Sequence, residues 1–151
     1  YFQDAVDHIH AAQSQADDYL DADDIVANAL WGSTYPNPRT WFNQIVKYHL
    51  DVKVAGKNPA IYRNGTLDNS VATELGVSIF RSYSEGASGK FYYGISKTAL
   101  IHSEAAAAVG ERWTATITGL TAGVKYYVQY RPDVDDPDEG SYSGIYTEYS
   151  T

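Results

Sequence analysis

The sequence predicts an α+β chain, in which a helical first third precedes an all-β remainder. Residues 4–31 contain no Pro or Gly, and their apolar residues recur at the 4-3-4-3 spacing of an amphipathic helix. From about residue 50 the apolar residues alternate instead, as they do in a half-buried strand. The alternation is most regular over residues 113–130, which are rich in β-branched and aromatic side chains. We therefore divide the chain into an acidic helical segment, 1–49, and a β-sandwich, 50–151.

The first predicted helix has a seam of apolar residues that only Asp23 interrupts. The seam residues are Ala5, Ile9, Ala12, Ala16, Tyr19, Val26 and Leu30. A heptad seam favours pairing between chains, which would make this segment an oligomerisation stem. The acidic run 21–24 is also a plausible break between two shorter helices that pack on their own chain. Both interpretations follow from the residues.

A second helix is predicted after the first, and the charge is concentrated in front of it. Asn37 and Pro38 suit the N-cap and first helical position, and the apolar face continues to about His49. Seven Asp and no Lys or Arg precede Arg39, so residues 1–38 carry seven of the chain's eight net negative charges. This imbalance indicates two structural units. The acidic balance argues against nucleic-acid binding, which needs clustered Lys and Arg.

Short strands and turns are predicted in order after residue 50. Val52, Val54 and residues 59–62 suit a first strand, and Asn64-Gly65 is typical of a tight turn. The next inward-facing sets are Leu75, Val77 and Ile79, then Phe91, Tyr93 and Ile95. Residues 82–90 suit a loop, 98–101 a sheet-switching strand and the Ala-rich 104–109 a helical turn. The closing strand is expected to carry Tyr142, Ile145, Tyr146 and Tyr149.

Residues 113–130 predict two strands joined by a corner. Leu120, Gly123 and Tyr126 have the spacing of a tyrosine corner, in which a Tyr hydroxyl bonds to upstream backbone. A strand ending in Gly-Leu, a Thr-Ala-Gly turn and the following Tyr-x-Val-x-Tyr resemble the fibronectin type III family. The resemblance covers about residues 50–151 and implies a sandwich of about seven strands without chemistry of its own. Ile79 stands where the family usually has Trp, and Trp113 is expected to fill that space.

Tyrosine is unusually frequent, with 14 residues against 4 Phe and 3 Trp. A Tyr side chain combines a large apolar body with a polar tip, so outward-facing Tyr suit sugar stacking or protein contact. The candidate binding residues are Tyr92, Tyr127, Tyr142 and Tyr146. The alternative is that these side chains are partly buried strand positions or cross-strand pairs.

The loop 132–141 crowds carboxylates together. Its candidate metal ligands are Asp133, Asp135, Asp136 and Asp138. Hard oxygen ligands of this kind are those that Ca²⁺ prefers. The full calcium-loop motif is absent, however, so a solvated acidic turn is the alternative. No other cofactor is expected.

The sequence contains no recognisable catalytic motif, phosphate loop or zinc-helix motif. It also has no Cys, and no apolar run approaches the ~20 residues of a membrane helix. We expect a non-catalytic structural or adhesion module of an extracellular assembly, such as a phage virion fibre or decoration protein or a bacterial surface protein. Its expected partners are proteins, a second copy through the N-terminal helix, and a surface glycan. The alternative is a carbohydrate-binding or spacer module of a secreted enzyme.

Overall fold

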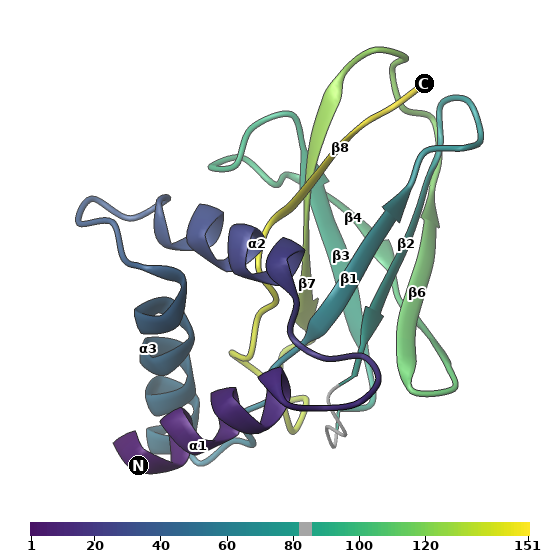
Figure 1. Cartoon of the computed structure of the whole chain (residues 1–151). Coiled ribbons are helices and arrows are strands. Elements are labelled where there is room, and N and C mark those ends of the chain that lie inside the picture. Colours follow the sequence, from purple (N-terminus) through teal and green to yellow (C-terminus); the bar gives the residue numbers. More distant parts are fainter. Residues whose placement is uncertain (82–85) are drawn as a thin grey trace.

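The computed structural model describes residues 1–81 and 86–151. Helices α1 (Phe2–Gln13), α2 (Ala22–Gly32) and α3 (Trp41–Val54) come first, and in Figure 1 they gather on one side of a sandwich of strands. The α+β prediction is therefore confirmed. Part of the loop predicted over 82–90 lies outside the described residues, and Gly89 and Lys90 already belong to a strand.

The prediction of one long first helix is wrong, and the alternative of two shorter helices is correct, although the break spans residues 14–21 and α2 already begins at Ala22. Asp21 ends an extended segment and caps α2, because its carboxylate accepts the Asp24 N–H at 2.9 Å. The Asp24 carboxylate accepts the Asp21 N–H in return, also at 2.9 Å. This reciprocal capping box starts a new helix where the heptad reading required an uninterrupted one.

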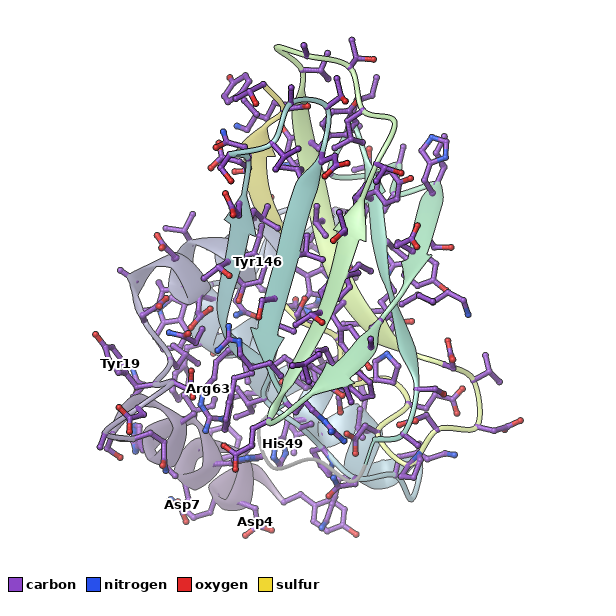
Figure 2. The ribbon with its side chains drawn as sticks, turned by 90° about the vertical axis from the view of Figure 1, so that its right-hand side faces the viewer. Asp4, Asp7, Tyr19, His49, Arg63 and Tyr146 are labelled. Atoms are coloured by element: carbon purple, nitrogen blue, oxygen red, sulfur yellow. The ribbon has the colours of Figure 1, made fainter. Side chains whose placement is uncertain are left out.

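The predicted seam is divided between the inside and the outside of this chain. Ala5, Ile9 and Ala12 are buried in a core shared by α1 and α3. Tyr19 and Val26 are exposed, and Figure 2 shows Tyr19 pointing away from the body of the molecule. The three buried residues already contact this chain's own helices, so they are not available to pair with a second copy.

Helix α3 begins and ends later than predicted. Its N-cap is Thr40, whose hydroxyl accepts the Asn43 N–H at 3.2 Å. It continues through Val54, across the proposed division at residue 50, so the strand predicted from Val52 and Val54 is wrong. Val52 is buried in the helical core, and two alternating Val are too few to distinguish a strand from a helical turn.

Two antiparallel four-stranded sheets form the sandwich. The first has the order β1 (Arg63–Asp68), β2 (Leu75–Phe80), β6 (Arg112–Ile117) and β5 (Ala107–Val109). The second has the order β4 (His102–Ala105), β3 (Gly89–Gly94), β7 (Lys125–Pro132) and β8 (Tyr146–Tyr149). Their inner faces enclose an apolar core that includes Leu75, Val77, Ile79, Phe91, Ile117 and Val128.

Trp113 is buried in this core, as predicted. It lies opposite Ile79 in the β2–β6 register and is 2% exposed. Its ring stacks on Tyr130 of the facing sheet, with centroids 5.6 Å apart and planes 16° apart. One large aromatic residue on β6 therefore occupies the space left by the smaller Ile79.

Two local predictions in the sandwich are wrong for the same reason, since tertiary pairing overrides local preference. Residues 102–105 and 107–109 form edge strands that pair with β3 and β6, although their Ala content favours a helix. Asn64 and Gly65 lie within β1, at a register shift between Arg63 and Thr66, and Asn64 has φ +54°. Strand β3 ends at Gly94, so Ile95 is outside it and exposed.

Helix α2 joins the helices to the sandwich, packing on β1 and β8. The Asp24 carboxylate accepts the N–H groups of Asn64 and Gly65 at 2.7 and 3.2 Å. A salt bridge between Arg112 and Asp18, 2.8 Å long, adds a second link from β6 to the segment before α2. Hydrogen bonds and a salt bridge therefore hold the helices against the sheets.

Candidate functional site: an aromatic and cationic groove

Arg131 brings two of the predicted binding tyrosines together. Its guanidinium lies over the ring of Tyr92 at 4.7 Å and over the ring of Tyr142 at 5.1 Å. Tyr92 comes from β3, Arg131 from β7 and Tyr142 from the segment before β8. Gln129 is buried and accepts the Arg131 Nε–H at 3.0 Å, which fixes the guanidinium between the two rings.

The aromatic row continues from the sandwich onto the helices. Trp31, in the last turn of α2, lies 5.9 Å from Tyr142 and 5.4 Å from Tyr48 of α3 between ring centroids. The Tyr48 hydroxyl donates to the Ala60 carbonyl at 2.6 Å and so anchors that end of the row. Side chains from α2, α3, β3, β7 and the segment before β8 therefore form one continuous aromatic row, in which Trp31 and Tyr48 are largely buried.

Two hollows flank this row, with volumes of about 670 and 340 Å³. Both are lined by Trp31, Tyr35 and Tyr142, so they share one aromatic wall. We use the name aromatic groove for the two hollows together, defined by these three residues and by Arg39, Lys97 and Arg131. Its size is in the range of small-ligand sites, roughly 300–1,000 Å³.

The groove carries positive charge on an acidic protein. Two other lysines in its larger hollow are neutralised, since Lys47 pairs with Asp51 at 2.7 Å and Lys57 with Glu139 at 3.6 Å. Within residues 1–81 and 86–151, no carboxylate forms a salt bridge with the three groove cations. Arg39 lies over Tyr35 at 4.4 Å and donates to Gln44 at 3.2 Å, and Lys97 donates to the Ser33 hydroxyl at 2.8 Å.

The fold itself is identified by its sheet orders and by one hydrogen bond. Sheet orders β1-β2-β6-β5 and β4-β3-β7-β8 are those of an immunoglobulin-like sandwich in which β7 is strand F. The Thr121 N–H donates to the Tyr126 hydroxyl at 2.8 Å, which is the predicted tyrosine corner at the start of that strand. Residues 63–151 form a fibronectin type III-like β-sandwich.

Comparison with known proteins adds little to this description. No protein-family model matches the chain, and no curated protein matches it. A solved structure, the fn3 domain of human collagen alpha-1(XX) chain, is similar at a TM-score of 0.43 and 17% identity, covering 62% of this chain and 85% of that one. No helix in the described part of the chain is long and apolar enough to cross a membrane.

Two of the four predicted binding tyrosines lie elsewhere in the fibronectin type III-like unit. Tyr127 is half-buried where the sandwich meets the helices, with Lys125 Nζ 5.5 Å from its ring centroid. Tyr146 turns toward α2 and donates to the Asp24 carboxylate at 2.5 Å. A Cβ on Gly65 would be 2.4 Å from the Tyr146 ring, so this strand position needs a glycine. Tyr146 thus links the two units and does not line the groove.

Two carboxylates of the acidic loop accept hydrogen bonds that hold neighbouring segments of the chain in place. Buried Asp136 accepts the N–H groups of Ala87 and Ser88 at 2.8 and 3.0 Å. Buried Asp138 accepts Asn58 Nδ2 at 2.8 Å, the Tyr62 hydroxyl at 3.2 Å and the Gly86 N–H at 3.0 Å. These bonds give two of the predicted metal ligands a structural role.

The other two predicted metal ligands lie at the surface of this loop. Asp133 pairs with Lys90 at 2.9 Å, and the lysine lowers the pKa of that carboxyl. Asp135 is exposed and has φ +68°. Among the described residues, no three His, Cys, Asp or Glu are grouped to hold a metal ion. These contacts lead us to expect that this loop is an acidic turn that does not bind calcium, which a solution measurement tests.

A histidine pair lies between α1 and α3, away from the groove. His8 Nδ1 and His49 Nε2 are 3.1 Å apart and share one hydrogen bond. His49 is 5% exposed, and its Nδ1 has no hydrogen-bond partner within the described residues. Burial lowers the pKa of both imidazoles, that of His49 to about 4. Asp4 of α1, Lys53 of α3 and Arg63 of β1 are the charged groups that act on the pair.

Of the residues that line the groove, only Tyr142 was among the predicted binding residues, and Tyr92 lies beside the groove against Arg131. Trp31, Tyr35 and Arg39 surround the Gly32-Ser33 stop and the two prolines of a connecting segment. Aromatic and cationic residues in a loop are a recognisable signal of a binding site. Nothing in their spacing indicates that they would meet Tyr142, more than 100 positions away.

Proposed function

We propose that this chain is a non-catalytic adhesion module of an extracellular assembly, such as a virion fibre or decoration protein or a bacterial surface protein, and that it holds a surface saccharide in the aromatic groove. The observation that supports this proposal is the shared wall of Trp31, Tyr35 and Tyr142 between two hollows of ligand size. Aromatic faces bind the apolar faces of sugar rings, while the polar tips and nearby cations contact hydroxyl and acidic groups.

The same groove also supports the alternative, a carbohydrate-binding module of a secreted enzyme. Both functions require saccharide recognition by residues from the helices and the sandwich. They differ in the polypeptide to which this unit belongs. The sequence that neighbours residues 1–151 in the parent protein distinguishes the two, since a catalytic domain there favours the enzyme.

The experiment is a broad glycan array probed with the whole chain. We expect binding to at least one saccharide class, and loss of that binding in Tyr142→Ala. Tyr149→Ala is the matched control, because Tyr149 is exposed on β8 and does not line the groove. Both variants are checked for an unchanged thermal midpoint. If the folded chain binds no saccharide on the array, the proposed function is contradicted.

Light scattering tests the expected pairing of copies through the helices. Because Ala5, Ile9 and Ala12 are buried against α3, we propose that any dimer uses another surface of the chain. Val26 lies on α2 and is 67% exposed. A dimer that persists in Val26→Asp would therefore use a surface outside α2. A dimer that dissociates in this variant would assign the contact to α2.

A further inference from the structure

The groove cations have unused hydrogen-bonding capacity. Arg131 donates through Nε only, and within the described residues its two terminal nitrogens make no hydrogen bond. In the described part of the chain, Lys97 Nζ has a single partner, the Ser33 hydroxyl, although an ammonium can donate three bonds. Among the same residues, the Arg39 guanidinium donates one bond, to the neutral amide of Gln44. These donors are held in place, but residues 1–81 and 86–151 leave some of their hydrogen-bonding capacity unused.

Their charge is also uncompensated, which is unusual for this chain. The net charge is −8, yet the described lining of the smaller hollow includes Lys97 and Arg131 and no carboxylate. Arg39 lies at the shared wall through its contact with Tyr35. Positive charge concentrated in a hollow of an otherwise acidic protein attracts an anion and repels cations.

From this juxtaposition we infer that the occupant of the aromatic groove is an anionic saccharide, one that carries carboxylate or sulfate groups on its rings. This inference rests on the proposed function and names the ligand class. Tyr35 and Tyr142 contact ring faces, while Arg39, Lys97 and Arg131 donate to the acidic groups. Charge-assisted bonds from arginine to planar carboxylates are among the strongest available.

A single-stranded nucleic acid would also use aromatic and cationic contacts, but it fits less well. Such a strand follows a positively charged path over several nucleotides. As far as residues 1–81 and 86–151 show, the groove has three uncompensated cations, and the chain is strongly acidic overall. The observations therefore favour a short saccharide over a polyphosphate backbone.

The test measures affinity with matched probes and the whole chain. The probes are oligogalacturonate against its methyl ester, sialyllactose against lactose, and a sulfated oligosaccharide against its desulfated parent. We expect the charged member of at least one pair to bind at least about tenfold more tightly than its neutral partner, since a bond to a charged group is worth about tenfold or more. A preference for the charged member of the first two pairs indicates carboxylate recognition, and a preference in the third pair indicates sulfate recognition.

Charge variants identify the residues responsible. We expect Arg131→Gln and Lys97→Gln each to lower the affinity for the charged probe about tenfold and to leave the affinity for a neutral probe nearly unchanged. Lys125→Gln is the matched control, because it removes one charge from the same strand as Arg131 but lies outside the groove. Thermal midpoints identify any variant that is misfolded, and Arg131→Lys restores part of the affinity if charge is the cause.

Each outcome has a defined meaning. Equal binding of charged and neutral partners, or equal losses in the control and groove variants, overturns the inference and leaves the adhesion function standing. Tighter binding of an oligothymidylate than of every saccharide overturns the ligand class. Absence of binding to all probes, on the array as well, overturns the inference and the proposed function together.

Discussion

The Tyr146 hydroxyl donates a hydrogen bond to the Asp24 carboxylate across 122 positions of sequence. The same carboxylate also accepts the backbone N–H groups of Asp21, Asn64 and Gly65. Asp24 is fully buried, and burial raises its pKa although the four donors act in the opposite direction. One side chain thus caps α2, fixes the irregular start of β1 and binds β8.

Replacing Tyr146 with Phe is expected to lower the free energy of unfolding by about 1.5–3 kcal/mol, the usual value of a hydrogen bond to a charged group. The ring still packs on Gly65, so the change isolates the hydroxyl. Urea denaturation measures it, with Tyr149→Phe on the same strand as the control. A loss as small as that of the control would show that the bond to Asp24 contributes nothing.

The histidine pair predicts loss of stability in mild acid. Its imidazoles are neutral in the folded protein, because their pKa values are lowered, whereas an unfolded His takes up a proton near pH 6.5. The unfolded state therefore binds more protons below that pH. The free energy of unfolding has its full value above pH 6.5 and falls between pH 6.5 and 4, by about 3 kcal/mol for a shift of the size of that of His49.

Denaturation at several pH values compares His49→Leu with the wild type. The variant should lose stability less steeply between pH 6.5 and 4, whatever its stability at neutral pH. His102→Gln is the control, because His102 is exposed on edge strand β4. Parallel pH profiles for all three proteins would rule out a role for the pair.

Asp138 is expected to be a strong stability determinant. The Asp138 carboxylate is fully buried and accepts hydrogen bonds from Asn58, Tyr62 and Gly86. An Asn side chain has only one acceptor oxygen, so Asp138→Asn weakens or breaks some of these bonds. Unsatisfied buried groups cost about 1–3 kcal/mol each, so we expect a loss of at least about 2 kcal/mol. Asp135→Asn is the matched control, since that exposed residue has a left-handed conformation that Asn tolerates. Equal losses of unfolding free energy in the two variants would contradict a structural role for the bonds to Asp138.

Calcium is expected to leave the unfolding temperature unchanged. Asp136 and Asp138 are buried and already accept hydrogen bonds, so they cannot turn to a metal without leaving backbone donors unpaired. Differential scanning calorimetry with millimolar CaCl₂, and with MgCl₂ as the ionic control, measures this. A rise with calcium alone that disappears in Asp133→Asn would establish a metal site on this loop.

Much of the sandwich could be predicted from sequence because its signals are local. Alternation placed Leu75, Val77 and Ile79 on an inner face, and all three are buried. The spacing of Leu120, Gly123 and Tyr126 predicted the tyrosine corner, which a single short-range hydrogen bond confirms. A pattern that depends on neighbours within a few residues can be read without knowing the fold.

Features that depend on distant partners could not be predicted. Asn64-Gly65 has the composition of a hairpin turn, but its N–H groups bind Asp24 and its missing side chain makes room for Tyr146. The Ala-rich 104–109 segment became strand because sheet edges were available to it. The groove likewise requires Trp31 to meet Tyr142, which no local pattern indicates.

The most direct test of this account is an NMR titration of the ¹⁵N-labelled whole chain with an anionic oligosaccharide, starting with oligogalacturonate. A groove built by two parts of the chain predicts that the Trp31 indole N–H and the backbone signals of Arg131 and Tyr142 shift together, at one affinity. Lys125 signals should stay unchanged. Shifts confined to the sandwich with Trp31 unaffected, or no shifts with any anionic saccharide, would contradict it.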